Sequence, residues 1–376
     1  MSTPELALDD EQAALEETVA RFVDAEATIA TTRALVESGA DYDPAVWAQL
    51  AGDLGLVALG VPEYLGGAGR GLLEASIVAR ELGRVLYSGP YLPVTMALVA
   101  LVAGVDTDTG ARWLPTVVAG EVVVTPALAG LRGRWSPAEE PPEATEGGVD
   151  GGDSWVIDGS RHLVMAAGTA DAFVVPGLVG DAVGLFVVPV GDQVTVTRLD
   201  TLDLTRTLSM VEFASAPAEL LVEPGQAETV LESMLNWALV LQANESAGAA
   251  GECVRLSVEY AKVRTQFDEP IGSYQAVAHT CAEMFSDAEH AGGSAHYAAA
   301  AAAFGASDAA LAARVAAAYV GRSFESIAES TIHVHGGIGF TWEHDAHLYY
   351  RRARSAGLLF GRYDEHLEAV ATLSGL

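Results

Sequence analysis

The stretches RTQFDEPIGSYQAVAH (residues 264–279) and IHVHGGIGFTWEHDAHLYYRRAR (residues 332–354) decide how this chain folds. The glycine turn of the second follows a helical pattern, so it is not the strand-to-helix G-x-G-x-x-G turn of a dinucleotide-binding fold. The chain also contains neither a Walker loop nor a G-x-S-x-G nucleophile elbow. The two stretches offer instead an arginine, Arg264, and a glycine turn, which are groups suited to binding an anion.

Both stretches lie in a region with helical periodicity that runs from about residue 223 to residue 376. Alanine-rich runs at 298–303 and 309–318 have high helix propensity and let helices approach closely, so a helical bundle is predicted. Residues 121–222 differ, because short runs rich in Val, Phe and Thr are divided there by Gly, Asp and Pro. That pattern is typical of a small antiparallel barrel or sandwich.

The first 120 residues are predicted to be α-helical, which makes the whole chain α+β. Asp9 and Gln12 have the spacing of a capping box, and apolar residues follow at helical intervals. The predicted domains are an N-terminal α-helical domain (1–120), a β-barrel or sandwich (121–222) and a C-terminal four-helix bundle (223–376). Residues 136–152, acidic and rich in Pro and Gly, are predicted to form a surface loop.

Composition limits the partners of the chain. Its 51 acidic and 20 basic residues give a formal net charge of -31, a field that repels nucleic acid and anionic membrane surfaces. We expect no membrane insertion or export, because there is no signal-peptide pattern and no apolar run of about 18 residues. Cys253 and Cys281 are too few and too far apart in sequence for a disulfide scaffold, which fits a reducing cytoplasm.

Taken together, RTQF…PIG…QA…H and the HGGIG stretch closely resemble segments of the acyl-CoA dehydrogenase family, and the α-β-α order extends this resemblance over nearly the whole chain. The resemblance implies FAD as cofactor, an acyl-CoA substrate, a tetramer of homologous subunits and an electron-transfer flavoprotein as partner. The implied reaction is α,β-dehydrogenation, in which a carboxylate removes the α-proton while the β-hydride passes to the flavin.

The resemblance also implies which residues contact FAD. They are Arg264, Gln266, Phe267 and Gln275 in the first stretch, His333, Gly336, Gly337 and Gly339 in the second, and Thr125 and Met165 in the β region. In the family the two stretches complete a flavin site on a neighbouring subunit. Around Thr125 the string reads TPALAG where relatives have Thr-Glu-Pro…Gly-Ser, and Met165 stands near a usual Thr. The chain thus keeps the residues it would donate and has altered those that would hold its own isoalloxazine ring.

The customary catalytic base is missing. Counting along the chain puts Phe360 where family members commonly place their Glu, and Ala238 where some others place it. Glu245 lies two helical turns beyond Ala238, on about the same face, and is the candidate base. The alternative for Glu245 is a buried structural carboxylate, because a buried carboxylate need not act as a base.

These departures, with the string DLTR at 203–206, resemble the α2β2 acyl-CoA dehydrogenases of actinobacterial steroid side-chain breakdown. We therefore predict a subunit that acts on a bulky acyl-CoA, with two alternatives open: a homotetramer that uses Glu245, and a flavin-free scaffold. A metal site is not predicted from His333, His335, His344 and His347, since no cysteine lies near them and a turn separates the two pairs.

Overall fold

The structure, a computed structural model, describes residues 7–133, 141–147 and 154–376. The N-terminal helices are α1 (Asp10–Ala25), α2 (Ile29–Ser38), α3 (Pro44–Trp47), α4 (Leu72–Arg84), α5 (Tyr91–Ala103) and α6 (Asp108–Val118), with short helical turns η1 (Ala48–Asp53), η2 (Leu56–Ala58) and η3 (Glu63–Leu65). The strands that follow are β1 (Val124–Pro126), β2 (Glu143–Glu146), β3 (Trp155–Met165), β4 (Ala172–Val179), β5 (Ala182–Pro189), β6 (Val194–Arg198) and β7 (Leu208–Val222), with the turn η4 (Ala167–Thr169).

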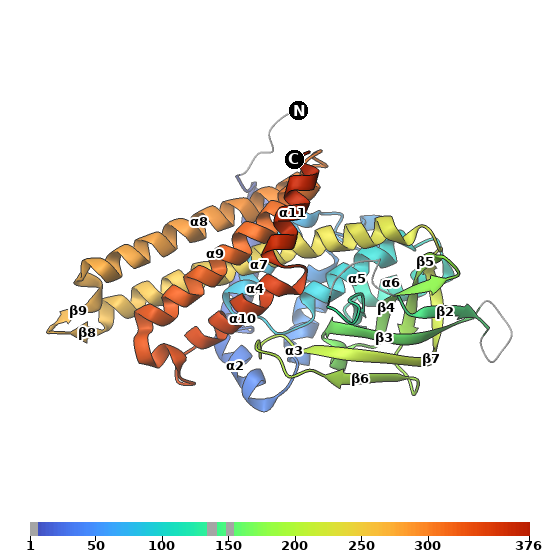
Figure 1. Ribbon diagram of the computed structural model, residues 1–376, viewed down its shortest axis with the longest axis horizontal. Helices are drawn as coiled ribbons and strands as arrows, with labels where there is room; N and C mark the ends of the chain where they lie inside the picture. Colours follow the sequence, from blue (N-terminus) through green and yellow to red (C-terminus); the bar gives the residue numbers. More distant parts are fainter. Residues whose placement is uncertain (1–6, 134–140, 148–153) are drawn as a thin grey trace.

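The C-terminal part is helical apart from one hairpin. Its elements are α7 (Ala227–Val263), β8 (Thr265–Gln266), β9 (Glu269–Pro270), η5 (Ile271–Ser273), α8 (Gln275–Ala303), α9 (Ala309–His335), η6 (Gly336–Phe340), α10 (Ala346–Leu359) and α11 (Tyr363–Leu373). With 37 residues, α7 is about 55 Å long. Helices α7, α8 and α9 run along the long axis of the molecule, with the strands at one end and the β8–β9 hairpin at the other (Figure 1).

The predicted α+β architecture is confirmed, and so is the capping box that starts α1. The Asp9 carboxylate accepts a hydrogen bond from the backbone N–H of Gln12 at 2.8 Å, and the Gln12 side chain accepts one from the N–H of Asp9 at 3.1 Å. These two bonds satisfy backbone donors that a helix start otherwise leaves unpaired. The divisions at residues 120 and 222 stay predictions of domain boundaries.

The strands close into a small barrel. Strand β4 pairs with both β2 and β5, and the ring continues from β2 through β3 and β7 back to β5. Most pairs are antiparallel as predicted, but β1 and β2 each run parallel to β4. Side chains of alternating residues fill the interior, among them Ile157, Phe173 and Phe186.

The predicted loop at 136–152 is partly wrong. Residues 143–146 form strand β2, which pairs antiparallel with β3 and buries Ala144. The prediction for residues 136–140 and 148–152 lies outside the described residues.

Helices α4 and α7 cross in close contact, and this crossing positions the candidate site. Gly83 of α4 lies against the backbone of Glu245, and Gly248 of α7 lies against the backbone of Arg80. A Cβ atom at either glycine would overlap a carbonyl group of the other helix, so only glycine permits this approach. Over the parts of the chain that the structure describes, no helix is both long and apolar enough to cross a membrane.

Candidate functional site

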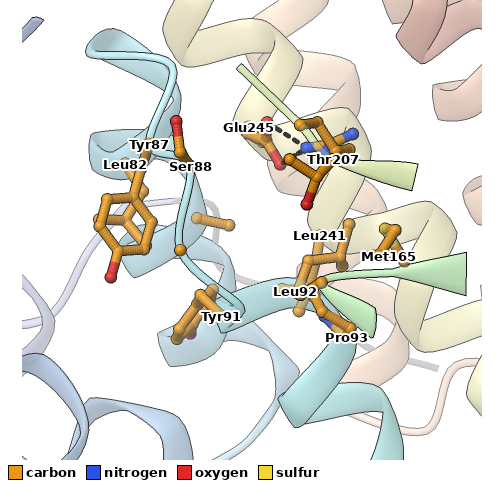
Figure 2. A pocket seen from close by; sticks show the side chains of 14 residues that line it. Leu82, Tyr87, Ser88, Tyr91, Leu92, Pro93, Met165, Thr207, Leu241 and Glu245 are labelled. Atoms are coloured by element: carbon orange, nitrogen blue, oxygen red, sulfur yellow. Dashed lines mark hydrogen bonds and ion pairs between the residues drawn. The ribbon is translucent and has the colours of Figure 1, made fainter. Parts of the chain in front are cut away.

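A narrow cavity lies where α4, α5 and α7 meet the end of strand β3. Its volume is about 30 Å³, room for two or three water molecules. The lining residues are Ala79, Leu82, Tyr87, Ser88, Gly89, Tyr91, Leu92, Pro93, Met165, Ala166, Arg206, Thr207, Leu241 and Glu245. Figure 2 shows Tyr87, Ser88 and Tyr91 on one side and Glu245, Thr207 and Met165 on the other. Most of the wall is apolar, so its few polar groups decide what it can bind.

Glu245, the candidate base, is the carboxylate of this cavity, and two arginines hold it. Nη2 of Arg206 donates to both carboxylate oxygens, at 2.5 and 2.6 Å, and Nη1 of Arg352 donates to Oε1. The Glu245 side chain is only 15% exposed. Charge-assisted bonds of this kind are about twice as strong as neutral ones, so the carboxylate is held firmly in one position.

Arg352 of α10 is the centre of the network. Its side chain is 2% exposed and forms an ion pair with Asp203 at 2.7 Å. Its Nη2 donates to the Thr205 hydroxyl at 2.7 Å and to the Thr205 carbonyl at 3.1 Å. Asp203 in turn accepts bonds from the N–H and hydroxyl of Thr205, which fixes the loop between β6 and β7. One guanidinium therefore links this loop, α7 and α10.

The four charges of the network balance. Two arginines, 206 and 352, face two carboxylates, 203 and 245, so a group that is nearly out of contact with water carries no net charge. Burial, the largest effect, lowers the pKa of Arg206, although Glu245 acts to raise it. Burial also acts to lower the pKa of Arg352, but Asp203 and Glu245 outweigh it and the pKa rises. Both guanidinium groups stay charged at any ordinary pH.

Arg206 and Ser88 keep unused hydrogen-bonding capacity in the cavity. Within the described part of the chain, Nη2 is the one nitrogen of Arg206 that donates a hydrogen bond, which leaves Nε and Nη1 available. The buried hydroxyl of Ser88 likewise has no partner among the described residues. Buried polar groups without a protein partner normally bind water or a ligand.

The two customary base positions lie elsewhere. Ala238, on α7, is fully buried in the hydrophobic core, and Phe360, at the end of α10, is 3% exposed. Phe360 borders a second, open cleft of about 490 Å³, lined by Arg132, Gly133, Leu163, Leu235, Arg314, Leu358, Phe360, Gly361, Arg362 and Glu365. The benzyl group therefore stands at the edge of a ligand-sized cleft, where it offers no proton acceptor.

Thr125 and Met165, the two flavin contacts predicted in the barrel, lie together. The Thr125 hydroxyl donates to the Met165 carbonyl at 2.8 Å, and both residues are buried. Met165 lines the narrow cavity, whereas the hydroxyl of Thr125 is committed within the chain. Met165 lies beside Leu241, in the middle of α7, so both residues are far from the β8–β9 hairpin, which is at one end of the molecule (Figure 1).

Three other predicted flavin contacts, Arg264, Gln266 and Phe267, lie at the β8–β9 hairpin. Phe267 and Asp268 form its two-residue turn, with φ of 54° and 66°. Two positive φ values match the twist of a hairpin but strain residues with a Cβ, and Phe267 is also 89% exposed. Tyr274 donates to the Gln266 carbonyl at 2.9 Å and so supports the turn. No acidic side chain among the described residues forms an ion pair with Arg264, which follows the last residue of α7.

The glycine turn behind α9 is open at two of its three predicted positions. Gly336 has φ of 62°, and neither there nor at Gly337 would a Cβ meet another described atom within 4 Å. Gly339 is different, because a Cβ there would lie 3.1 Å from His335, so packing within the chain explains this glycine. His333, exposed on α9, lines a groove that the start of α8 also borders, just after Gln275.

Of the histidines near this turn, His335 packs against other rings. The His-x-His pair lies on helix α9, so the rings of His333 and His335 point in directions roughly 200° apart. His335 stacks on Tyr260 with ring centroids 4.5 Å apart and touches His344 at 4.3 Å. Its Nδ1 donates to the Thr331 carbonyl, and burial lowers the pKa of the ring, which favours the neutral form.

Sequence reasoning found Glu245 but neither the two arginines that hold it nor Asp203, which pairs with one of them. Arg206 and Asp203 stood inside the string DLTR, and Arg352 inside YYRRAR, without a role. The available signal was their type, since a buried carboxylate requires a cationic partner. Arg352 and Asp203 are 149 positions apart in the sequence, however, and only the packing of α10 against the barrel loop brings them together.

Comparison with known proteins agrees with this architecture. Models of the acyl-CoA dehydrogenase N-terminal and C-terminal domains match residues 9–121 and 228–373. Acyl-CoA dehydrogenase IpdE2 of Mycobacterium tuberculosis is 33% identical over 365 residues, 93% of each chain. IpdE2 of Mycolicibacterium smegmatis is 30% identical and covers 96% of this chain and 98% of its own. The crystal structure of the ChsE4-ChsE5 complex from Mycobacterium tuberculosis superposes with a TM-score of 0.86 at 26% identity, over 99% of each chain. The chain belongs to the acyl-CoA dehydrogenase family.

Proposed function

We propose that this chain is a subunit of an FAD-dependent acyl-CoA dehydrogenase, that it completes the flavin site of a homologous subunit in a tetramer, and that it does not supply the catalytic base. The proposal rests on the state of Glu245. Its two oxygens already accept charge-assisted hydrogen bonds from Arg206 and Arg352, so the carboxylate is held as the partner of two cations and is not free to turn toward a substrate. Glu245 then acts as a fixed counter-ion.

The residues of the hairpin and the glycine turn fit a cofactor held mainly by another subunit. Phe267 keeps a strained and exposed conformation that contributes nothing to the packing of its own chain. Arg264 can pair with a phosphate, and Gly336 and Gly337 leave the backbone open to close approach. When bound, FAD supplies the acceptor for the β-hydride of the acyl group. The chain's own contribution is to hold one side of that cofactor.

We also propose a cytoplasmic heterotetramer that passes its electrons to an electron-transfer flavoprotein. The similarity to the ChsE4-ChsE5 complex supports a partner that is homologous rather than identical. Free thiols at Cys253 and Cys281 support a reducing compartment. The substrate is an acyl-CoA with a bulky acyl group.

Flavin content and native mass test the proposal. The chain purified alone should carry little FAD and show no turnover, whereas co-expression with a homologous subunit from the same genome should yield a flavin-bound tetramer. One FAD per chain and robust acyl-CoA oxidation by the lone chain would overturn it.

A second candidate is a self-sufficient dehydrogenase, favoured by the fact that Glu245 does line the cavity. The variant Glu245→Gln separates the two. If Glu245 is a counter-ion, kcat of the assembled enzyme should stay within about tenfold of the parent. A general base contributes about 10²- to 10⁴-fold, so a loss of that size would favour the second candidate.

A further inference from the structure

We infer that the narrow cavity of this subunit is a ligand site of its own, which selects a neutral oxygen, a ketone or hydroxyl, carried on a slender apolar group. This goes beyond the proposed function, since it concerns a cavity that has no free base. The inference starts from the unused donors of Arg206. Its side chain is 12% exposed, and Nη2 is the nitrogen that donates to Glu245. Nε and Nη1 therefore remain as donors for a ligand that enters the cavity.

A second observation points to the same kind of ligand. Ser88 lines the cavity, and its hydroxyl is buried and has no partner among the described residues. A hydroxyl can either donate or accept, so it can pair with a ketone or with an alcohol. Leu92, Met165 and Leu241 supply an apolar wall for the carbon atoms that carry the oxygen.

The charge balance decides between a neutral oxygen and a carboxylate. Arg206 and Arg352 are already neutralised by Asp203 and Glu245. A carboxylate ligand would add a buried negative charge without a counter-ion, which is costly. A ketone or hydroxyl oxygen accepts the same hydrogen bonds without that cost.

The volume limits the size of the group. About 30 Å³ admits two or three atoms the size of a water molecule, so a carbonyl group and an adjacent methyl fit, whereas a ring system does not. Such a group arises either at the tip of an oxo-acyl-CoA or in a free small ketone. The chemistry that the cavity recognises is the same in both cases.

Three thioesters of equal length test the selection: pentanoyl-CoA, 4-oxopentanoyl-CoA and glutaryl-CoA. Binding to the assembled protein is measured by calorimetry, with 2-pentanone as a separate arm that reports a free ligand. We expect the oxo compound to bind about tenfold or more tightly than pentanoyl-CoA, because a site with buried donors rejects a ligand that lacks the acceptor. Glutaryl-CoA should also bind more weakly, because its carboxylate would be a buried charge without a counter-ion. If only 2-pentanone binds, the site serves a free small ketone.

Variants test whether the preference for 4-oxopentanoyl-CoA arises in the cavity. The double variant Arg206→Met with Glu245→Met removes the guanidinium without adding an amide donor and keeps the network neutral, so it should lose most of its preference for 4-oxopentanoyl-CoA over pentanoyl-CoA. Arg206→Lys keeps a donor and should retain part of the preference. Arg351→Gln is the matched control, since Arg351 lies beside Arg352 on α10 but bonds to the Leu202 carbonyl outside the cavity.

Two results would overturn the inference. Equal binding of all three thioesters and no binding of 2-pentanone by the parent protein would mean that the cavity holds ordered water only. A preference that survives in the double variant would place the selective site elsewhere, for example in the partner subunit. Neither result bears on the flavin content and native mass that test the proposed function.

Discussion

At the residue scale, Arg352 is the member of the buried charge network that binds the most other residues of it. Arg352→Met would leave Asp203 and Glu245 buried without their shared cation. Breaking a buried ion pair from one side costs about 3–5 kcal/mol, so we expect the free energy of unfolding to fall by that amount. Urea denaturation followed by circular dichroism measures it. The neighbouring change Arg351→Met should shift the midpoint little, and equal shifts in the two variants would contradict the assigned role of Arg352.

His366 gives a pH prediction at the same scale. Burial, aided by Arg314, lowers the pKa of this ring to about 4, below the unfolded value of about 6.5. The unfolded chain therefore takes up a proton that the folded chain refuses, and stability is lost as pH falls from about 6.5 toward 4.

The measurement compares unfolding of the parent and of His366→Gln at pH 7.5 and pH 5. The parent should lose more stability on acidification than the variant, because other acidic groups titrate equally in both. His279→Gln, which changes an exposed histidine, should follow the parent. Parallel losses in the parent and His366→Gln would show that the ring does not resist protonation.

The sequence predicted Glu245 but not its partners, because spacing along a chain relates only residues of the same element. Helical spacing relates Glu245 to Ala238 because both are on one element. Arg206 and Arg352 come from a loop and from another helix, and periodicity within one element carries no information about such encounters. Pairing of distant charges is a property of the packed chain.

At the scale of elements, the crossing of α4 and α7 depends on two glycines. Gly248→Ala would place a methyl group into the Arg80 carbonyl and push the helices apart. Overpacking of this kind costs about 1–3 kcal/mol, and it should also displace Glu245, which lies one turn away. Gly251 is the control on the same helix, since a Cβ there meets nothing within 4 Å among the described atoms.

Thermal unfolding distinguishes these two variants. Gly251→Ala should raise stability by up to about 1 kcal/mol, because alanine is the better helix former. Gly248→Ala should lower it. A stabilising effect at both positions would mean that the two helices do not approach as closely as their backbones indicate.

Element types were largely predictable, and the exceptions are instructive. Helices such as α1 and α9 have long periodic patterns or alanine-rich sequences that tertiary contacts only reinforce. Strand β2 was missed because three of its four residues are polar and exposed, and Ala144 alone faces the core. The parallel pairing of β1 and β2 with β4 follows from chain crossings that local patterns do not encode.

At the scale of the whole molecule, the predicted flavin contacts lie in two separate places. Thr125 and Met165 are in the barrel, while Arg264 and Phe267 are on the hairpin at one end of the molecule (Figure 1). One chain therefore cannot bring both groups to the same cofactor. The sequence motifs predicted the two groups, but their separation follows from α7: Met165 lies in the cavity beside Leu241, in the middle of this helix, and Arg264 follows its last residue, about 35 Å further along the axis.

This separation makes Phe267 the sharpest test of assembly. Phe267→Asn places at a positive φ a residue that tolerates it, so the isolated chain should be as stable as the parent or about 1 kcal/mol more stable. The same change removes an aromatic surface that is 89% exposed, so the co-expressed tetramer should bind FAD more weakly. Phe304 is an exposed phenylalanine at the opposite end of α8, so Phe304→Asn is the matched control and should leave the flavin content unchanged.

Flavin absorbance per tetramer and thermal unfolding of the lone chain report the two effects separately. Higher stability with lower flavin content would mean that the strain at Phe267 is retained for the partner's cofactor, whereas unchanged flavin content would remove the hairpin from the site.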